Sequence, residues 1–290
     1  MRCAKMARII GVLLLGAALA GCSSIRLGYN NLPTLSYWWL DGYLDFDDAQ
    51  APQVRTELAQ LLDWHRQNEL PKFAALLQEA EALAPADITP AAVCRLSDEV
   101  RQRLVAVARQ AEPAGAALLT RLEPAQLAQL ERKYAKANAE YRKEWLALSP
   151  ERRRAKRYDQ LLERYEDFYG RLDGAQREVL RASTETSALD WERQFAERQR
   201  RQQRALQTLR RLQEADATAA QAGTAIRAYV SDIAAPPPGA WRDYQDALRD
   251  EGCRQLATLH RTTTPAQRAR AATRLHSYQT DVLHLAGSGS

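Results

Sequence analysis

The residues with the most scope for chemistry in this chain of 290 residues are its cysteines and histidines. They are Cys3, Cys22, Cys94 and Cys253, and His65, His260, His276 and His284. A zinc site needs three or four converging ligands, often at short spacings such as C-x-x-C, and no such spacing occurs here. A glycine-rich phosphate loop, a G-x-S-x-G turn and an S-x-x-K motif are also missing from the sequence. We therefore expect no metal, no cofactor and no catalytic residues. A cell-envelope enzyme is the alternative, because paired carboxylates cannot be recognised among so many Asp and Glu residues.

Cys22 ends an N-terminal segment with the layout of a secretory signal. Three basic residues precede an apolar run from Ile9 to Leu19, which is too short to span a membrane. The four residues Leu19-Ala20-Gly21-Cys22 resemble the lipobox of bacterial lipoproteins. The resemblance implies cleavage before Cys22, acylation of its thiol and of the new amino terminus, and anchoring to a membrane. Residues 1–21 are thus expected to be a signal peptide.

With Cys3 removed and Cys22 acylated, Cys94 and Cys253 remain as an even pair in an oxidising compartment. We expect them to form a disulfide that ties an early helix to a late one. Closing a loop of this length would stabilise the fold by about 5 kcal/mol in the chain-entropy model. Two buried free thiols are the alternative. Cleavage also removes three of the 41 basic residues and none of the 36 acidic ones, so the mature chain is nearly neutral.

The rest of the chain has the hydrophobic periodicity of helices. From Asp48 onward, apolar residues recur at helical spacing, and proline and glycine divide the pattern into segments. No segment has the alternation or the β-branched content of a strand. We expect an all-α, elongated multi-helix bundle that forms a single helical domain over 49–285, followed by a disordered tail at 286–290. In the helix that starts at Thr89-Pro90, the residues predicted to face the core are Val93, Leu96, Val100, Leu104 and Val107.

The stretch between Ala175 and Ala222 contains no glycine or proline, which favours one helix of about 40 residues and about 60 Å. Its middle is rich in arginine and glutamine, so we expect this long helix to project partly into solvent. Its candidate binding residues are Arg193, Arg198, Arg200, Arg201, Arg204, Arg210 and Arg211. They suit acidic lipid headgroups, lipopolysaccharide phosphates or an acidic protein surface. A solvated helix face is the alternative, and export behind a lipobox argues against nucleic acid.

Residues 22–48 differ in composition from the helical body, because they are rich in aromatic, glycine and turn residues. We expect a short irregular tether after the lipidated Cys22. The aromatic side chains either cover the helical body or lie at the level of the lipid headgroups, where Trp and Tyr are favoured. Either interpretation holds the body close to the membrane. The candidate membrane-proximal aromatic residues are Tyr37, Trp38, Trp39 and Tyr43.

A local pattern recurs at the expected helix starts: Leu122–Gln126, Leu148–Arg152, Leu172–Gln176 and Thr263–Gln267, with Ile88–Ala92 as a looser copy. Its second residue can cap the helix, and glutamine three residues later can complete a capping box. The pattern resembles the L-T-x-x-Q motif of the Spy/CpxP periplasmic stress chaperones, which bind unfolding clients. Common helix capping is the alternative explanation, and Glu123 and Asp173 replace the threonine of the motif.

The lipobox, the segment Gly28–Pro33 with Trp38-Trp39, and the turn Thr263–Arg268 resemble a family of uncharacterised proteobacterial lipoproteins. This resemblance implies a helical protein of the outer membrane that faces the periplasm, and it brings no catalytic residues. Ser23 follows Cys22, where retention in the inner membrane commonly uses aspartate. We expect a non-enzymatic, lipid-anchored protein that binds envelope proteins or surfaces in assembly or stress, with a periplasmic chaperone as the alternative.

Overall fold

The computed structural model of the protein describes residues 25–287. Every regular element in this range is a helix, so the predicted all-α multi-helix fold is confirmed. No helix of residues 25–287 has both the length and the apolar character needed to cross a membrane. The predicted signal peptide, Cys22 and the last three residues of the predicted tail lie outside the described residues.

Residues 25–30 are helical and lead into a series of separate helices. These are α2 (Leu32–Leu44), α3 (Gln50–Asn68), α4 (Leu70–Leu83), α5 (Pro90–Gln110), α6 (Glu112–Leu119), α7 (Pro124–Tyr141), the π-helix η1 (Arg142–Leu146), α8 (Pro150–Tyr169), α9 (Gly174–Glu185), α10 (Trp191–Glu214), α11 (Ala219–Ala234), α12 (Ala240–Arg261) and α13 (Pro265–Gly287).

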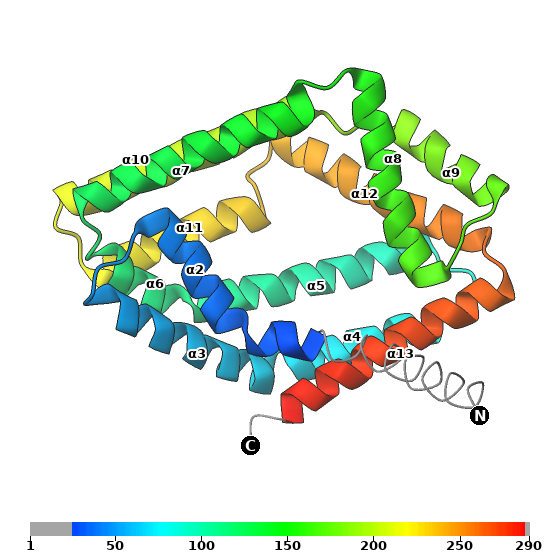
Figure 1. Ribbon diagram of the computed structural model, residues 1–290, viewed down its shortest axis with the longest axis horizontal. Coiled ribbons are helices and arrows are strands. Elements are labelled where there is room, and N and C mark those ends of the chain that lie inside the picture. Colours follow the sequence, from blue (N-terminus) through cyan, green and yellow to red (C-terminus); the bar gives the residue numbers. More distant parts are fainter. Residues whose placement is uncertain (1–24, 288–290) are drawn as a thin grey trace, which may run out of the picture.

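Helices that are distant in the sequence pack against one another. α4 packs along α13, α6 along α11, and α5 along α12. In Figure 1, α7 and α10 lie side by side along one edge of the molecule, and α4 and α13 lie together along the opposite edge. α5 runs between these two edges (Figure 1). Besides α12, α5 contacts α11 and α4.

Two separate clusters of buried apolar side chains stabilise the fold. One joins α2, α7 and α10 through Leu44, Leu122, Leu127, Leu130, Leu206 and Leu209. The other joins α8, α9, α12 and α13 through Tyr169, Leu172, Leu180, Leu259 and Ala271. The molecule therefore has a core at each end of the view in Figure 1.

The predicted helix boundaries follow from local capping. Thr89, Ser149 and Asp173 each accept a hydrogen bond from the backbone N–H three residues later, which satisfies an otherwise unpaired donor at the helix start. Gly170 ends α8 with φ +74°, a conformation that glycine adopts readily. Asp45 ends α2 in the left-handed αL conformation.

The segment expected to be an irregular tether is helical over most of its length. Residues 25–30 and α2 account for this, and α2 packs on α3 and α7. Pro33 lies in the first turn of α2, where its missing N–H has no consequence. The Asp41 carboxylate accepts the N–H of Phe46 at 3.0 Å just beyond the helix. The turn residues thus mark the ends of helices instead of an irregular segment.

The expected helix of about 40 residues is two helices, α9 and α10, separated by residues 186–190. Contacts from α12 stabilise this break: Glu251 accepts the N–H of Ala188 at 2.8 Å, and the Tyr244 hydroxyl accepts that of Asp190 at 2.8 Å. The Asp190 side chain then caps α10. α10 also lies along α7 instead of projecting (Figure 1), so that expectation was wrong. Hydrogen bonds from α12 to the backbone thus stabilise a break in the helix, although this stretch contains no Gly or Pro.

Candidate functional site

The apolar stripe of α5 is only partly covered. The sequence predicts that five residues of this helix face the core, yet none of its residues is fully buried. Val100 is 39% exposed and Leu104 is 61% exposed. For these two positions the predicted inward orientation is wrong, because both side chains are exposed. The stripe forms part of a surface instead.

A cavity of about 690 Å³ opens beside this stripe. Residues of α4, α5, α8, α12 and α13 form its walls, and most of them are aliphatic or aromatic. The walls include Phe73, Leu77, Val93, Leu96, Leu161 and Leu256. The volume falls within the range of roughly 300–1,000 Å³ that is common for ligand sites. We call this cavity together with Val100 and Leu104 the α5 groove.

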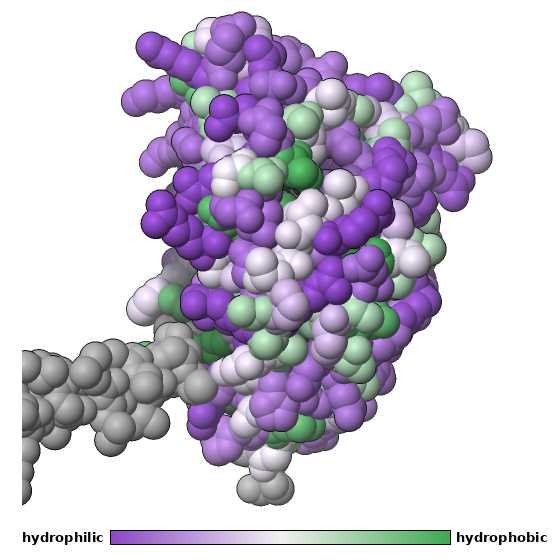
Figure 2. Space-filling model, turned by 90° about the vertical axis from the view of Figure 1, so that its right-hand side faces the viewer, coloured by the Kyte–Doolittle hydropathy of each residue, from purple (hydrophilic) through white to green (hydrophobic). Residues whose placement is uncertain are grey.

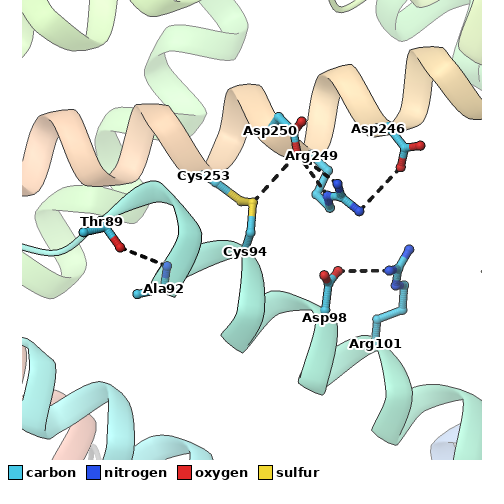
Figure 3. Close-up of a disulfide and its surroundings, with 9 residues drawn as sticks. All are labelled: Thr89, Ala92, Cys94, Asp98, Arg101, Asp246, Arg249, Asp250 and Cys253. Atoms are coloured by element: carbon cyan, nitrogen blue, oxygen red, sulfur yellow. Dashed lines mark hydrogen bonds and ion pairs between the residues drawn. A yellow bond between two sulfur atoms is a disulfide. The ribbon is translucent and has the colours of Figure 1, made fainter.

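Cys94 of α5 and Cys253 of α12 fix one side of the α5 groove. Their Cα atoms are 5.5 Å apart, and the two sulfur atoms lie at disulfide distance, as the sequence predicts. Figure 3 shows the sulfur atoms joining the two helices. Cys253 also lines the cavity, so the cross-link holds α5 beside the space that its own stripe borders.

The rim of the α5 groove next to this cross-link carries charges of both signs. Asp98 accepts a hydrogen bond from Arg101 at 2.9 Å, and Asp250 accepts one from Arg249 at 3.0 Å (Figure 3). Arg164 adds a further charged side chain to the lining. An apolar floor with a mixed polar rim is the usual anatomy of a protein-binding surface.

His260 closes the inner end of the groove as a neutral imidazole. Its Nε2 lies 2.8 Å from the Ala86 carbonyl oxygen, which can only accept, so Nε2 carries the proton. Nδ1 therefore accepts the hydroxyl of Tyr169 at 2.8 Å. Burial lowers the pKa of His260, although the hydrogen bond to Ala86 opposes this, and burial raises the pKa of Tyr169 to about 12. Both groups stay uncharged near neutral pH, which suits an apolar site.

A second cleft, of about 620 Å³, lies farther along α5 and is bordered by α6 and α11. Its charged residues are Arg101, Arg103, Arg109, Arg227 and Glu112. Arg227 forms an ion pair with Glu112, and Arg103 lies 3.8 Å from the buried carboxylate of Glu69. This cleft is basic, whereas the α5 groove is apolar, so the two sites favour different ligands.

A family model matches residues 42–219, which is more than half of the chain. The chain belongs to the DUF6279 family. This is a family of unknown function, and no curated protein and no solved structure matches the chain. In this DUF6279 protein the matched residues contain all of α5 and α10. The α12 and α13 walls of the α5 groove lie outside the match, as do Trp38 and Trp39.

The structure brings the seven candidate arginines of α10 together with acceptors of the same chain. The acceptors, in chain order, are Ala240 O for Arg193, Asn138 for Arg198, Glu197 for Arg200 and Arg201, Asp232 for Arg204, Glu131 for Arg210, and Gln207 O for Arg211. Aromatic stacking also holds this helix, with Trp191 parallel to Trp145 at 4.0 Å between ring centroids. Arg193, Arg198, Arg204 and Arg210 connect α10 to other parts of the chain, and the other three pair within α10, so the seven do not form an uncompensated anion site.

The four candidate aromatic residues divide into two pairs. Tyr37 is buried and Tyr43 is half-buried, and both pack on the body, Tyr37 against Phe46 at 5.9 Å between ring centroids. Trp38 and Trp39 are each 63% exposed. Tyr37 and Tyr43 thus cover the body, as one of the two interpretations predicts, whereas Trp38 and Trp39 form an exposed aromatic surface.

The glutamines of the recurring helix starts tie pairs of helices together. The side-chain amides of Gln176 and Gln267 donate to one another at 2.8 and 2.9 Å and so join the starts of α9 and α13. Those of Gln50 and Gln126 do the same for α3 and α7, at 3.2 and 2.7 Å. Each amide also donates to a backbone carbonyl of the segment that precedes its partner's helix. The role of these residues in this structure is to connect helices.

Sequence reasoning missed one member of these pairs. Gln50 ends the stretch Phe46-Asp47-Asp48-Ala49-Gln50, which has the same spacing as the other copies. Its N–H binds the Asp47 carboxylate at 2.7 Å. A start at Thr218 with Gln221 was missed as well, although it forms a capping box. The spacing alone could have found both.

The histidines are spread over the molecule. His65 Nδ1 lies 2.7 Å from the Tyr29 hydroxyl, and His276 lies 3.2 Å from Glu81. In the part of the chain that the structure describes, no three His, Cys, Asp or Glu residues come close enough to hold a metal ion. The candidate site is the apolar α5 groove.

Proposed function

We propose that this DUF6279 protein is a non-enzymatic, lipid-anchored periplasmic protein that binds segments of envelope proteins in the α5 groove. The observation that carries the proposal is the uncovered apolar stripe of α5 beside a cavity of about 690 Å³. An apolar surface that the fold leaves open commonly marks an interaction site.

The dimensions of the groove suit a helical segment of a partner. The α5 stripe runs from Val93 to Leu104, which corresponds to three helical turns and about 17 Å. An amphipathic helix laid in a groove uses anchors over two to three turns. Arg164 and Arg249 of the lining, with Asp250 beside Arg249, supply polar partners for the flanks of such a helix.

The location in this proposal follows from the lipobox at Cys22 and from Ser23 after it. The pair Cys94 and Cys253 at disulfide distance supports it, because structural disulfides persist in oxidising compartments such as the periplasm. An outer-membrane anchor facing the periplasm would place the α5 groove among envelope proteins.

In-cell photo-crosslinking tests the proposal. A photoreactive amino acid at Leu104, in the groove, should capture a protein. The same amino acid at Arg210, exposed on α10, is the matched control and should capture little. Capture from position 210 and not from position 104, or capture of lipid alone at position 104, would contradict the proposed groove.

A chaperone for unfolding proteins is the second candidate, and the same open apolar groove favours it. Its test is aggregation of an unrelated unfolding protein in the presence of the purified mature chain. Leu104→Glu should reduce any protection, while Arg210→Glu should leave it unchanged. A protein that does not slow aggregation, yet gives one crosslinked partner in cells, is a specific binder and no general chaperone.

A further inference from the structure

α2 is apolar on two sides, and the fold covers only one of them. Tyr37 and Leu44 are buried against the body. On the other side, the exposed residues Leu32, Leu35, Trp38 and Trp39 are spaced so that they share a face of the helix. Just before them, Ile25 and Leu27 are also exposed. We call these six residues the α2 outer face.

The charge around the α2 outer face is low. Residues 25–39 contain Arg26 as their one charged residue, although 27% of the whole chain is charged. The first acidic side chain, Asp41, follows both tryptophans, and three more aspartates lie within the next seven residues. On the different face of the molecule seen in Figure 2, hydrophilic residues predominate and hydrophobic ones are scattered between them. The α2 outer face thus differs from an ordinary water-exposed surface.

The segment that carries this face is attached to the body on its inner side. Arg26 donates a hydrogen bond to Asp281 of α13 at 2.8 Å, and that carboxylate is almost completely buried. The Tyr29 hydroxyl binds His65 of α3 at 2.7 Å. Two helices from opposite ends of the chain therefore orient residues 25–30, and the exposed side chains belong to a fixed surface.

Cys22 precedes Arg26 by four residues, which can span at most about 14 Å. If Cys22 is acylated, as the proposed function requires, Arg26 lies within that distance of the acyl chains. The headgroup region of one leaflet is roughly 5–7 Å thick. The α2 outer face, which begins at Ile25, is thus held at the membrane surface by covalent geometry.

From these observations we infer that the α2 outer face is a bilayer-docking surface, which buries Trp38, Trp39 and the neighbouring aliphatic residues in the interface of the anchoring leaflet. Tryptophan is enriched at this depth because its ring is apolar and its N–H remains hydrogen-bonded. The docking supplies a second membrane contact beside the acyl chains. The acyl chains give stable attachment, and the aromatic contact adds a fixed orientation of the body.

The test uses the mature chain, residues 22–290, with Cys22→Ser, which keeps every described residue and removes the acylation site. We expect this protein to co-sediment with phosphatidylcholine vesicles at millimolar lipid. Trp38→Ser combined with Trp39→Ser should lower its partition by about tenfold or more, because two large aromatic side chains leave the interface. Vesicles with brominated acyl chains should quench the tryptophan fluorescence of the parent more than that of this variant.

Ile233→Ser is the control, since this residue is apolar and exposed on α11, away from the α2 outer face and the α5 groove. It should bind vesicles as the parent does. Far-UV circular dichroism checks that both variants remain folded. Absence of vesicle binding by the parent, or equal loss in the control, would overturn the inference. Lipid-independent self-association that disappears with Trp38 and Trp39 would assign the α2 outer face to a second copy of the chain.

These outcomes separate the inference from the proposed function. Failure of vesicle binding removes the docking surface but leaves the α5 groove and its crosslinked partner intact. Failure to crosslink at position 104 removes the groove and leaves the vesicle result unchanged.

Discussion

α5 and α10 have exchanged the roles that their sequences predict. α5 has a regular apolar stripe, yet no residue of this helix is fully buried. α10 is rich in arginine and glutamine, yet Phe195, Leu206, Leu209 and even Glu197 are buried. Periodicity shows which face of a helix favours contact with apolar groups, but it does not show whether the fold supplies that contact.

The difference comes from what the neighbours offer. Glu131 of α7 and Asp232 of α11 each pair with an arginine of α10, so the neighbouring helices supply partners for its charged side chains. On α5, Arg103 lies 3.8 Å from Glu69, but the apolar side chain of Leu104 stays exposed. This exposed apolar stripe is the reason to assign binding to α5 and support to α10.

The largest expected effect comes from breaking the attachment of α5 to α12. Cys94→Ser with Cys253→Ser should lower the free energy of unfolding by about 5 kcal/mol, because the cross-link closes a loop of 159 residues. Chemical denaturation with and without reductant measures this. Hydrogen exchange should rise in α5 before it rises in α10. Equal stability with and without reductant would mean that the pair is not bonded in the protein.

A pair of leucine substitutions tests the comparison itself. Leu209→Ala on α10 should cost about 2–5 kcal/mol, the usual range for a buried leucine. Leu104→Ala on α5 should cost less than about 0.5 kcal/mol, because this side chain is already 61% exposed. Urea denaturation of the two variants gives both values. A large loss of stability at Leu104 would show that α5 is covered in solution and would remove the α5 groove.

The sequence predicted local structure well, because local signals decide it. Thr89, Ser149, Asp173 and Gly170 mark helix ends through capping and backbone conformation, and the structure has those ends. The all-α class followed from periodicity. The predictions that failed concern features that depend on distant residues. The break at 186–190 depends on hydrogen bonds to Glu251 and Tyr244. The fixed position of residues 25–30 depends on the hydrogen bond from Arg26 to Asp281. Contacts of that kind leave no local signal.

The candidate site shows the same division. The pairing of Cys94 with Cys253 could be predicted, because few cysteines remained once two had been assigned. The groove could not, because periodicity does not show that Val100 and Leu104 stay exposed. The amide pair of Gln50 and Gln126 lies between these cases, since the spacing was visible but the partner was not.

Loss of the Glu197 charge on α10 should lower the free energy of unfolding more than loss of the exposed Arg109 charge on α5. Glu197→Gln should cost about 1–3 kcal/mol near pH 7, because Arg200 and Arg201 lose a buried acceptor. Burial alone would raise the pKa of Glu197, but the hydrogen bonds from these arginines outweigh it and lower the pKa. Its contribution is therefore present at neutral pH and is lost as the pH falls through the lowered pKa.

Arg109→Gln on α5 is the matched control for this substitution, because Arg109 is exposed and belongs to the second cleft. It should change the free energy of unfolding by less than about 0.5 kcal/mol. Thermal unfolding of both variants at pH 7 and pH 3.5 distinguishes them, since the penalty of Glu197→Gln should shrink at the lower pH. A constant penalty at both values would mean that the Glu197 charge does not stabilise α10.

The smallest expected effect is a pH dependence of the local stability of α5. His260 is neutral in the fold, where burial lowers its pKa, and its Nε2 holds the Ala86 carbonyl in the loop before α5. The unfolded chain therefore binds a proton that the folded chain does not, so the contribution of His260 to stability is full above about pH 6.5 and falls as the pH drops below it.

The slope of stability against pH is at most about 1.4 kcal/mol per pH unit for each histidine. His260→Gln should reduce this slope. Since the affected loop leads into α5, hydrogen exchange at pH 5.5 should quicken in α5 and not in α10; an equal change in both helices would mean that acid loosens the whole fold and not the loop before α5.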